Sequence, residues 1–276
     1  MQEGGFFYET DLSHVPFASL SHQGKVRQNN EDRLQVRSFI TVEHPPRHVL
    51  LAVLSDGVGG NCAGEVAAQI GVNSVTDYFG KVSSLDDPAA SLKDVIVAAN
   101  LSVLEASKGR PELEGMGATC ICALIVEKKL YLANLGDSRA YLLRGRTIRQ
   151  LNYDHTWLED TAGIGHPGSN SKTRDNPLAH ILSRYLGSAH PAWVDIRQRP
   201  EKRLLQINSP TTESLELHKG DHILLCSDGL TDMLTDGEIR AAIKGKMPQI
   251  DAQQLVLCAL EKGGHDNVSV ILMKIP

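Results

Sequence analysis

The sequence predicts a single α+β domain, and three observations support this prediction. The chain has 276 residues, which is the length of one or two domains, and no stretch rich in Ser, Gly or Pro is long enough to separate two. Strand-like and helix-like segments come in blocks rather than in the strict alternation of a parallel α/β fold. The longest apolar runs, at 49–54 and 120–126, are far shorter than the ~20 residues that cross a bilayer.

Hydrophobic periodicity predicts the elements in the first half of the chain. Residues 1–20 show no strong periodicity and are interpreted as an N-terminal arm or a first strand. Alternation of apolar and polar residues at 34–40 predicts a half-buried strand, and the apolar run at 48–54 predicts a fully buried one. Apolar side chains at helical spacing predict helices over 62–79 and about 88–107.

The second half begins with β-rich segments that short polar turns separate, a pattern typical of an antiparallel meander. These segments lie at 118–126, 129–136, 138–144 and 147–151. The turn-rich stretch 163–177 is the longest candidate loop, and loops of this length are either disordered or functional lids. Strands are then expected at 213–217, 222–227 and 267–275, with helices near 236–245 and 250–262.

Charge and cysteine content exclude several classes of protein. With 33 acidic and 28 basic residues, the net charge is −5, which argues against a nucleic-acid partner. The N-terminus lacks the pattern of a secretory signal, and no membrane partner is expected. The five cysteines include no CxxC pair, so we expect free thiols and a cytoplasmic location. No cysteine has an arginine six positions later, which excludes the phosphate-binding loop of a thiolate phosphatase.

One local pattern occurs twice in the chain. A buried strand runs into Ser-Asp-Gly at 55–57 and again at 227–229. Asp56 and Asp228 would thus be held rigidly at a strand end, where the following glycine allows a sharp turn or the close approach of a ligand. A single copy is typical of an ordinary strand-ending turn. Two copies on unrelated strands favour a functional pair of carboxylates.

Four further acids precede or follow predicted strands. Asp266 comes just before a strand, Asp137 lies at a predicted hairpin tip, and Glu31 and Asp32 come together before a strand. Hard oxygen ligands on separate rigid segments are what Mg²⁺ or Mn²⁺ requires. Two such ions ~3.5–4 Å apart can activate a bridging hydroxide against a phosphate ester. Arg27, four residues before Glu31, has the planar fork that suits the substrate phosphate.

Taken in order, eight segments of the chain resemble the type 2C, or PPM, family of metal-dependent protein serine/threonine phosphatases. They are GKVRQNNED (24–32), LSDGVGG (54–60), GATCICALI (117–125), LYLANLGDSRAYLLRG (130–145), DHT (154–156), ILSRYLG (181–187), LLCSDGLTDMLTDGEI (224–239) and GGHDNVSVIL (263–272). The resemblance implies a single catalytic domain over 21–276, whose flap is the loop near 163–177. It leaves the arm at 1–20 without a role.

The fold implied by this resemblance is a four-layer α-β-β-α sandwich, two antiparallel sheets flanked by helices, with a dinuclear centre at one end. The implied cofactors are two divalent ions, Mn²⁺ or Mg²⁺. Position by position, the resemblance implies that Asp56 bridges the two ions, that the Gly57 carbonyl is a further ligand, and that Asp228 and Asp266 bind one ion. It implies that Glu31 and Asp32 bind or orient metal-bound water and that Arg27 binds the phosphate. Asp137, with Asp228, would form a weaker third metal site.

The activity implied by the resemblance is hydrolysis of phosphoserine and phosphothreonine by direct attack of a metal-bridging hydroxide, without a phosphoenzyme. The implied partners are phosphorylated proteins, the substrates of a serine/threonine kinase, and the chain is expected to be a monomer. Val58 follows the first Asp-Gly pair, where some members of the family, notably animal ones, have a histidine proposed as the general acid. Bacterial members also lack that histidine, and a metal-bound water would then be the acid. Two alternatives are an inactive relative that acts as a binding or sensor module and a phosphatase for small phosphomonoesters.

Overall fold

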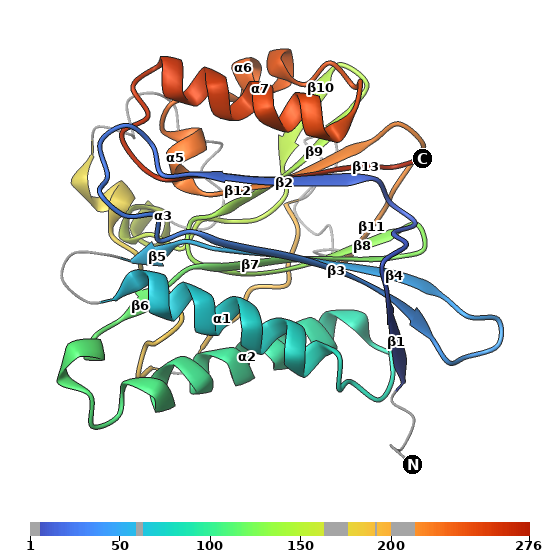
Figure 1. Cartoon of the computed structure of the whole chain (residues 1–276), viewed down its shortest axis with the longest axis horizontal. Helices are drawn as coiled ribbons and strands as arrows, with labels where there is room; N and C mark the ends of the chain where they lie inside the picture. Colours follow the sequence, from blue (N-terminus) through green and yellow to red (C-terminus); the bar gives the residue numbers. More distant parts are fainter. Residues whose placement is uncertain (1–5, 59–62, 163–175, 191, 200–212) are drawn as a thin grey trace.

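The computed structural model describes residues 6–58, 63–162, 176–190, 192–199 and 213–276. Two antiparallel sheets pack face to face, and helices cover the outer face of each (Figure 1). This arrangement confirms the predicted α+β sandwich. The six-stranded sheet has the order β1 (Phe7–Thr10), β3 (Arg33–Thr41), β4 (His48–Ser55), β7 (Cys120–Val126), β8 (Lys129–Leu135) and β11 (Ser214–Glu216). The five-stranded sheet has the order β10 (Thr147–Gln150), β9 (Arg139–Arg144), β12 (His222–Cys226), β13 (Val268–Lys274) and β2 (Phe17–His22).

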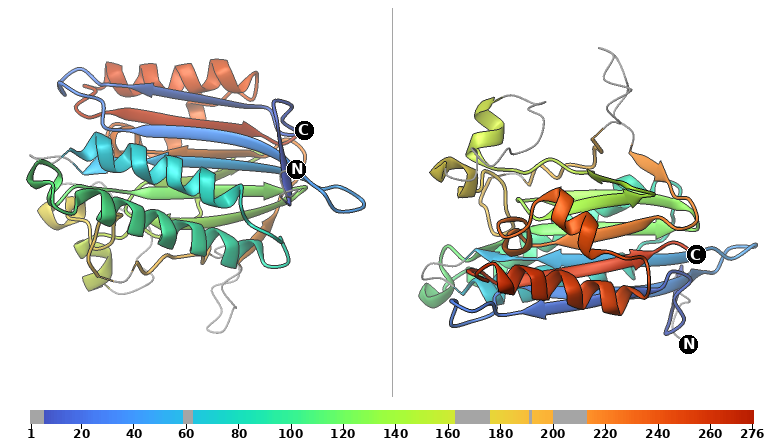
Figure 2. Two further views of the ribbon diagram at one scale, coloured as in Figure 1. Left: turned by 60° about the horizontal axis from the view of Figure 1, so that its bottom comes forward. Right: turned by 90° about the horizontal axis from the view of Figure 1, so that it is seen from above.

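Helices form the two outer layers, and Figure 2 shows both layers from other directions. The long pair α1 (Gly64–Phe79) and α2 (Pro88–Ser107) covers the six-stranded sheet, while α6 (Asp236–Ala242) and α7 (Pro248–Glu261) cover the five-stranded one. The shorter elements are β5 (Gly57–Val58), β6 (Gly117–Ala118), η1 (Pro111–Leu113), α3 (Trp157–Ala162), η2 (Pro177–His180) and α5 (Asp228–Thr231). Within the described ranges, no helix combines the length and the apolar character needed to cross a bilayer.

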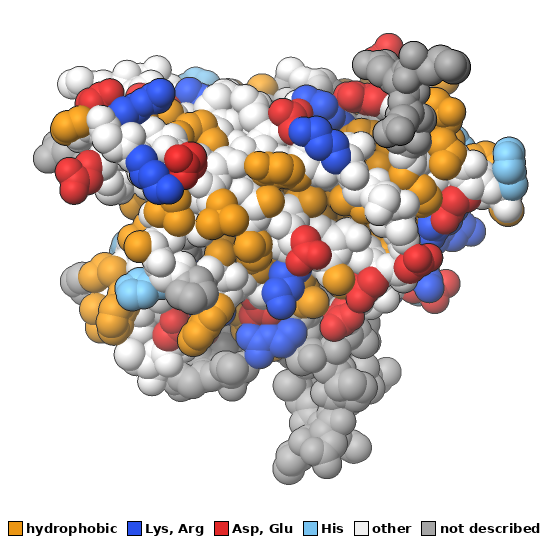
Figure 3. Space-filling model, turned by 90° about the horizontal axis from the view of Figure 1, so that it is seen from below, with side chains coloured by type: hydrophobic (Ala, Val, Ile, Leu, Met, Phe, Trp, Pro, Cys, Tyr) orange, Lys and Arg blue, Asp and Glu red, His pale blue; other side chains and the backbone are white. Residues whose placement is uncertain are grey.

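Strand β4 shows why the run at 48–54 is apolar on both faces. Leu51 and Val53 pack against α1 and α2, whereas Leu50 and Leu54 point into the core between the two sheets. Side chains alternate across a strand, so a central strand of this sandwich must be apolar at every position. The face of α1 and α2 that is turned to solvent is mixed, with hydrophobic side chains lying among charged ones (Figure 3).

The first described residues belong to the sheets. β1 pairs with β3, where Phe7 packs on Phe39 and Phe79, and β2 pairs with β13 at the edge of the other sheet. The alternative of a first strand is therefore correct for residues 7–10 and 17–20, which are integral to the sandwich rather than an arm outside it.

The predicted meander over 118–151 is wrong in one respect. β7 and β8 pair in the six-stranded sheet, whereas β9 and β10 pair in the five-stranded one. The chain therefore crosses from one sheet to the other between Leu135 and Arg139, and Asp137 lies at this crossing rather than at a hairpin tip. Both hairpins satisfy the same local pattern, so strand periodicity alone does not distinguish one sheet from two.

Candidate metal centre

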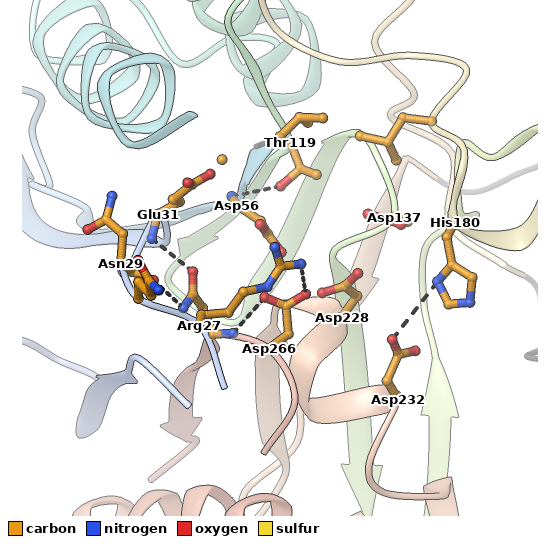
Figure 4. Close-up of a pocket in the computed structure, with 15 residues that line it drawn as sticks. Arg27, Asn29, Glu31, Asp56, Thr119, Asp137, His180, Asp228, Asp232 and Asp266 are labelled. Carbon is orange, nitrogen blue, oxygen red and sulfur yellow. Dashed lines mark hydrogen bonds and ion pairs between the residues drawn. The ribbon is translucent and has the colours of Figure 1, made fainter. Parts of the chain in front are cut away.

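An acidic pocket of about 470 Å³ lies at the end of the sandwich where β4 and β12 terminate. Six acids and one arginine line it, and they come from both sheets and from the loop before β3 (Figure 4). These residues are Arg27, Glu31, Asp56, Asp137, Asp228, Asp232 and Asp266. The structure thus brings six of the predicted site residues together, along with Gly57. Asp32 is the one predicted side chain that does not line the pocket.

Asp56 is held where β4 ends. Its backbone N–H donates to the Thr119 hydroxyl over 2.9 Å, and the Thr119 N–H donates to the Asp56 carbonyl over 2.8 Å. The next residue, Gly57, lies against the start of α1, where an added Cβ would be 2.5 Å from the backbone carbon of Gly64. A side chain is therefore excluded at position 57, and the Asp-Gly pair is required by backbone packing as well as by any ligand.

Asp228 reaches the same pocket from the other sheet. It is the first residue of the short helix α5, which follows β12, and Asp232 comes one turn later. His180, at the end of η2, approaches from the opposite wall, with its Nδ1 4.0 Å from Asp232 Oδ2. His180, Asp228 and Asp232 form the one group of three side chains, among the described residues, that could bind a metal ion together. Their ligand atoms all lie within 4.8 Å of one another.

The Asn267 side chain holds the loop that carries Arg27 and Glu31 in place through hydrogen bonds. Its side-chain oxygen accepts from the Glu31 N–H over 2.9 Å, and its amide nitrogen donates to the carbonyls of Gln23 and Asn29, each over 2.8 Å. This one buried side chain therefore ties the loop to the start of β13, next to Asp266.

Arg27 projects over the pocket and pairs with a predicted metal ligand. Its Nη2 lies 2.6 Å from Asp266 Oδ2, and its side chain is 54% exposed. This hydrogen bond is the first cause of the raised pKa of Arg27, to which the charges of Asp266, Asp228 and Glu31 add. The guanidinium is the one Lys or Arg group among the described lining residues, so it is the side chain available to an anionic substrate.

Asp32 lies behind the pocket. It is 3% exposed, and its Oδ2 accepts from the Ser227 hydroxyl over 2.9 Å. Its Oδ1 is buried without a hydrogen-bond partner in the part of the chain that the structure describes. Burial raises its pKa, and hydrogen bonds that involve Ser269, Ser227 and Asp56 oppose this shift.

Asp137 enters from the crossing between the sheets. Burial, with the negative charge of Asp154 second, raises its pKa to about 7. Asp154 is itself paired with Arg139, whose Nη2 lies 2.6 Å from Asp154 Oδ2. The two charges of this ion pair act on Asp137 in opposite directions, because Asp154 raises its pKa and Arg139 lowers it.

The carboxylates of the pocket destabilise one another in the ionised form. Burial, followed by the charges of Asp32 and Asp228, raises the pKa of Asp56 well above its ordinary value. Burial, followed by the charge of Asp137, does the same for Asp228. A divalent cation would relieve this repulsion, and carboxylate oxygens are its preferred ligands. The donor set of the pocket therefore fits a divalent metal centre.

Four residues of the site were not predicted from sequence: Thr119, His180, Asp232 and Asn267. Asp232 could have been found, because it follows Asp228 by four residues in SDGLTD and i,i+4 residues share a helix face. Asn267 follows Asp266 directly in a motif already singled out. Thr119 and His180 carry no local signal, because only the fold brings them to the pocket. The predicted flap at 163–177 lies almost wholly outside the described residues, since only 176 and 177 are described.

Comparison with known proteins places this architecture in a class. The family model described as protein phosphatase 2C matches residues 21–261. The serine/threonine phosphatase stp of Listeria monocytogenes is 29% identical over 256 residues, which cover 91% of this chain and 92% of the relative. Among solved structures, Stp1 from Staphylococcus aureus is 29% identical with a TM-score of 0.75, covering 97% of this chain and 98% of that one. The catalytic domain of PstP in complex with two manganese ions is 30% identical with a TM-score of 0.70, covering 94% and 97%.

The fold and these relatives define a class of protein serine/threonine phosphatases. The chain belongs to the protein phosphatase 2C family, as its sequence resemblance predicted. It is therefore a phosphoprotein phosphatase, and its substrates are phosphorylated proteins.

Proposed function

We propose that this chain hydrolyses phosphoserine and phosphothreonine directly, without a phosphoenzyme, at a dinuclear centre in the acidic pocket. The observation that carries the proposal is the convergence of six acids and one arginine in one pocket at the end of both sheets. Two divalent ions, Mn²⁺ or Mg²⁺, would supply the attacking hydroxide and the charge that neutralises the pocket. The solved PstP catalytic domain, a relative of this chain, contains two manganese ions.

The position of each acid in the pocket suggests its role in binding metal or orienting water. Asp56 would bridge the two ions from β4, with the Gly57 carbonyl as a further ligand, and Asp228 and Asp266 would hold one ion from the five-stranded sheet. Glu31 lines the pocket and would orient water. Buried Asp32 would act from behind, through Asp56, to orient metal-bound water.

Arg27 would bind the substrate phosphate. Its exposed guanidinium can donate two parallel hydrogen bonds to phosphate oxygens. Occupation of Asp266 by a metal would exchange the present ion pair for a metal bond and leave the guanidinium to the substrate. A weaker third metal site would use Asp137 with Asp228. His180 and Asp232 would contribute to it as well, since their ligand atoms lie within 4.8 Å of each other and of Asp228.

The domain extent, oligomeric state and cellular compartment of the enzyme are also part of the proposal. The whole sandwich, with β1 and β2 included, would act as one catalytic domain, monomeric, on the targets of a serine/threonine kinase. The thiols of Cys120, Cys122 and Cys226 are free and buried, which supports a reducing, cytoplasmic compartment.

Phosphopeptide hydrolysis under metal control tests the proposal. We expect turnover of phosphoserine and phosphothreonine peptides with Mn²⁺ or Mg²⁺ and its loss in excess EDTA. Activity that persists in EDTA would overturn the metal mechanism. A trapped phosphoenzyme during turnover would overturn the direct attack. Faster turnover of p-nitrophenyl phosphate and other small esters than of any phosphopeptide would favour the small-molecule alternative, and no turnover with bound metal would favour the binding module.

The role of Arg27 has a separate test. Arg27→Ala should chiefly raise KM for the phosphopeptide, because the guanidinium binds phosphate in both the ground state and the transition state. Lys25→Ala, which removes a cation from the same exposed loop, is the matched control and should leave KM unchanged. Unaltered KM and kcat in Arg27→Ala would contradict the proposed role of Arg27 in binding the substrate phosphate.

A further inference from the structure

A second pocket, of about 580 Å³, lies at the start of β12, the opposite end from Asp228. Six residues at ~3.3 Å each separate the two ends by about 20 Å. Figure 1 shows α5 toward one end of these strands and the C-terminus of the chain toward the other. The described lining of this pocket includes four basic side chains and no acidic one. The basic side chains are His222, Arg240, Lys244 and Lys274.

Backbone carbonyls hold two of the cations in place. Lys274 Nζ donates to the carbonyls of Gly245 and Lys246 over 2.8 and 3.1 Å. Arg240 donates to the carbonyl of Ile243 over 3.1 Å and to that of Gly145, while its Nε is buried without a partner among the described residues. These contacts fix the positions of the charges without neutralising them, because carbonyl oxygens carry no formal charge. No ion pair within the described ranges involves Arg240, Lys244 or Lys274.

Two acids lie next to lining residues without lining the pocket themselves. Asp251 is 1% exposed, and its two oxygens accept from the backbone N–H groups of Lys244 and Gly245 over 3.0 and 2.9 Å. Asp221, next to His222, is paired with Arg144 at 2.7 Å. The charge of Asp251 still acts on His222, but no carboxylate is among the described lining residues, where four basic side chains gather.

His222 provides a second, independent sign of a ligand. It is 8% exposed, and its Nε2 is buried without a hydrogen-bond partner in the described structure. The imidazole faces Gly245, where an added Cβ would lie 4.0 Å from Nε2, and both residues line the pocket. Buried polar atoms of folded proteins are nearly always partnered by protein, water or ligand. Burial, and then the charge of Lys274, lowers the pKa of His222, while the charge of Asp251 partly opposes this shift.

We propose that this pocket is a binding site for a phosphate-class oxyanion, either free orthophosphate or the phosphoryl group of a small phosphomonoester. Lys and Arg N–H groups are the donors that bind tetrahedral oxyanions through charge-assisted hydrogen bonds. The volume exceeds that of orthophosphate, so a bound phosphoryl group can carry an organic substituent. The site is separate from the acidic pocket, because it shares no lining residue with it.

Amide NMR of the full chain with Mg²⁺ tests this proposal. Orthophosphate is titrated at constant ionic strength while the N–H signals of Gly220 and Gly245 report on the basic pocket and that of Thr119 on the acidic one. We expect saturable shifts at Gly220 and Gly245, with affinity reduced about tenfold in Lys244→Gln or Lys274→Gln, since each loses one charge-assisted contact. Lys244 is exposed and its Nζ makes no hydrogen bond or ion pair with the described residues, so its replacement tests the charge.

Lys93→Gln, an equal charge change on the exposed face of α2, is the matched control and should bind orthophosphate as the unmodified chain does. Phenylphosphonate, whose P–C bond resists hydrolysis, distinguishes the two sources. Tighter binding than orthophosphate identifies a phosphomonoester site, and weaker binding identifies free phosphate. Shifts that grow linearly, that chloride reproduces, or that persist unchanged in both lysine variants would overturn the proposal.

Discussion

The two Ser-Asp-Gly segments have the same local sequence and deliver their carboxylates in different ways. After Asp56 the chain continues as the short strand β5, which pairs with β6, and Thr119 fixes the backbone on both sides of the aspartate. After Asp228 the chain turns at once into α5, and Asp228 is its first residue. The preceding serines differ too: Ser55 donates to the Thr119 carbonyl, whereas Ser227 donates to the buried carboxylate of Asp32. One motif therefore supplies a carboxylate from each sheet, and its surroundings decide how rigidly that carboxylate is held.

Replacing either aspartate should have the largest effect. Asp56→Asn and Asp228→Asn each remove a charge that would hold the ions, and we expect kcat to fall by about 10³-fold or more, equivalent to several kcal/mol of transition-state stabilisation. Loss of repulsion should leave the fold intact or raise the melting temperature of the EDTA-treated protein. Steady-state kinetics with saturating Mn²⁺ and circular dichroism measure both.

The pair of variants also compares the two segments. Asp56→Asn should weaken binding of both ions if Asp56 bridges them, and Asp228→Asn should chiefly weaken one. Calorimetric titration with Mn²⁺ counts the sites. Full activity in either variant, or an unchanged number of Mn²⁺ ions in both, would contradict the ligand assignment.

Thr119→Val should have the next largest effect, because it removes the hydroxyl that accepts from the Asp56 N–H and contacts Ser138 at 2.8 Å. Loss of a group that orients a metal ligand typically costs 10–100-fold in activity or metal affinity. We expect that loss in kcat/KM, with a higher Mn²⁺ requirement. Thr147→Val, which changes an exposed threonine on β10, is the matched control. Equal effects of the two variants would mean that Thr119 serves the fold alone.

Local sequence patterns predict most elements of the fold and most acids of the site, but not the contacts between segments that are distant in the sequence. Buried strands such as β4 and amphipathic helices such as α2 follow from local periodicity, and the acids at strand ends follow from local motifs. Assignment of β9 to the second sheet does not, because the same alternation suits either sheet. The role of Thr119 and the approach of His180 to Asp232 depend on contacts between distant segments, and no local pattern encodes them.

Asp137, at the crossing between the two sheets, should make the stability of the EDTA-treated protein depend on pH. Its pKa is raised from 3.8 to about 7 in the folded chain, so the folded state binds the proton more tightly than the unfolded state. The stability that this proton contributes is full below about pH 4 and is lost as the pH rises to about 7.

Asp137→Asn should remove this part of the pH dependence, so that its melting temperature exceeds that of the unmodified chain by several degrees at pH 8 but not at pH 4. Thermal unfolding followed by circular dichroism from pH 4 to 8 measures the difference. Asp94→Asn, at an exposed acid on α2, should leave the profile unchanged. Parallel profiles of Asp137→Asn and the unmodified chain would show that Asp137 is ionised throughout this range.

Ser227→Ala should have the smallest effect and completes the comparison of the two segments. The Ser227 hydroxyl donates to Asp32 Oδ2 over 2.9 Å and accepts from the Ser269 N–H over 3.0 Å. Its loss should cost about 1 kcal/mol of stability, typical of a hydrogen bond, and lower the melting temperature by ~2–4 °C. Because Asp32 lies behind the pocket, kcat should fall only a few-fold, far less than in Thr119→Val. A larger kinetic loss in Ser227→Ala would mean that the buried Asp32 positions the metal ligands more strongly than the backbone of Asp56 does.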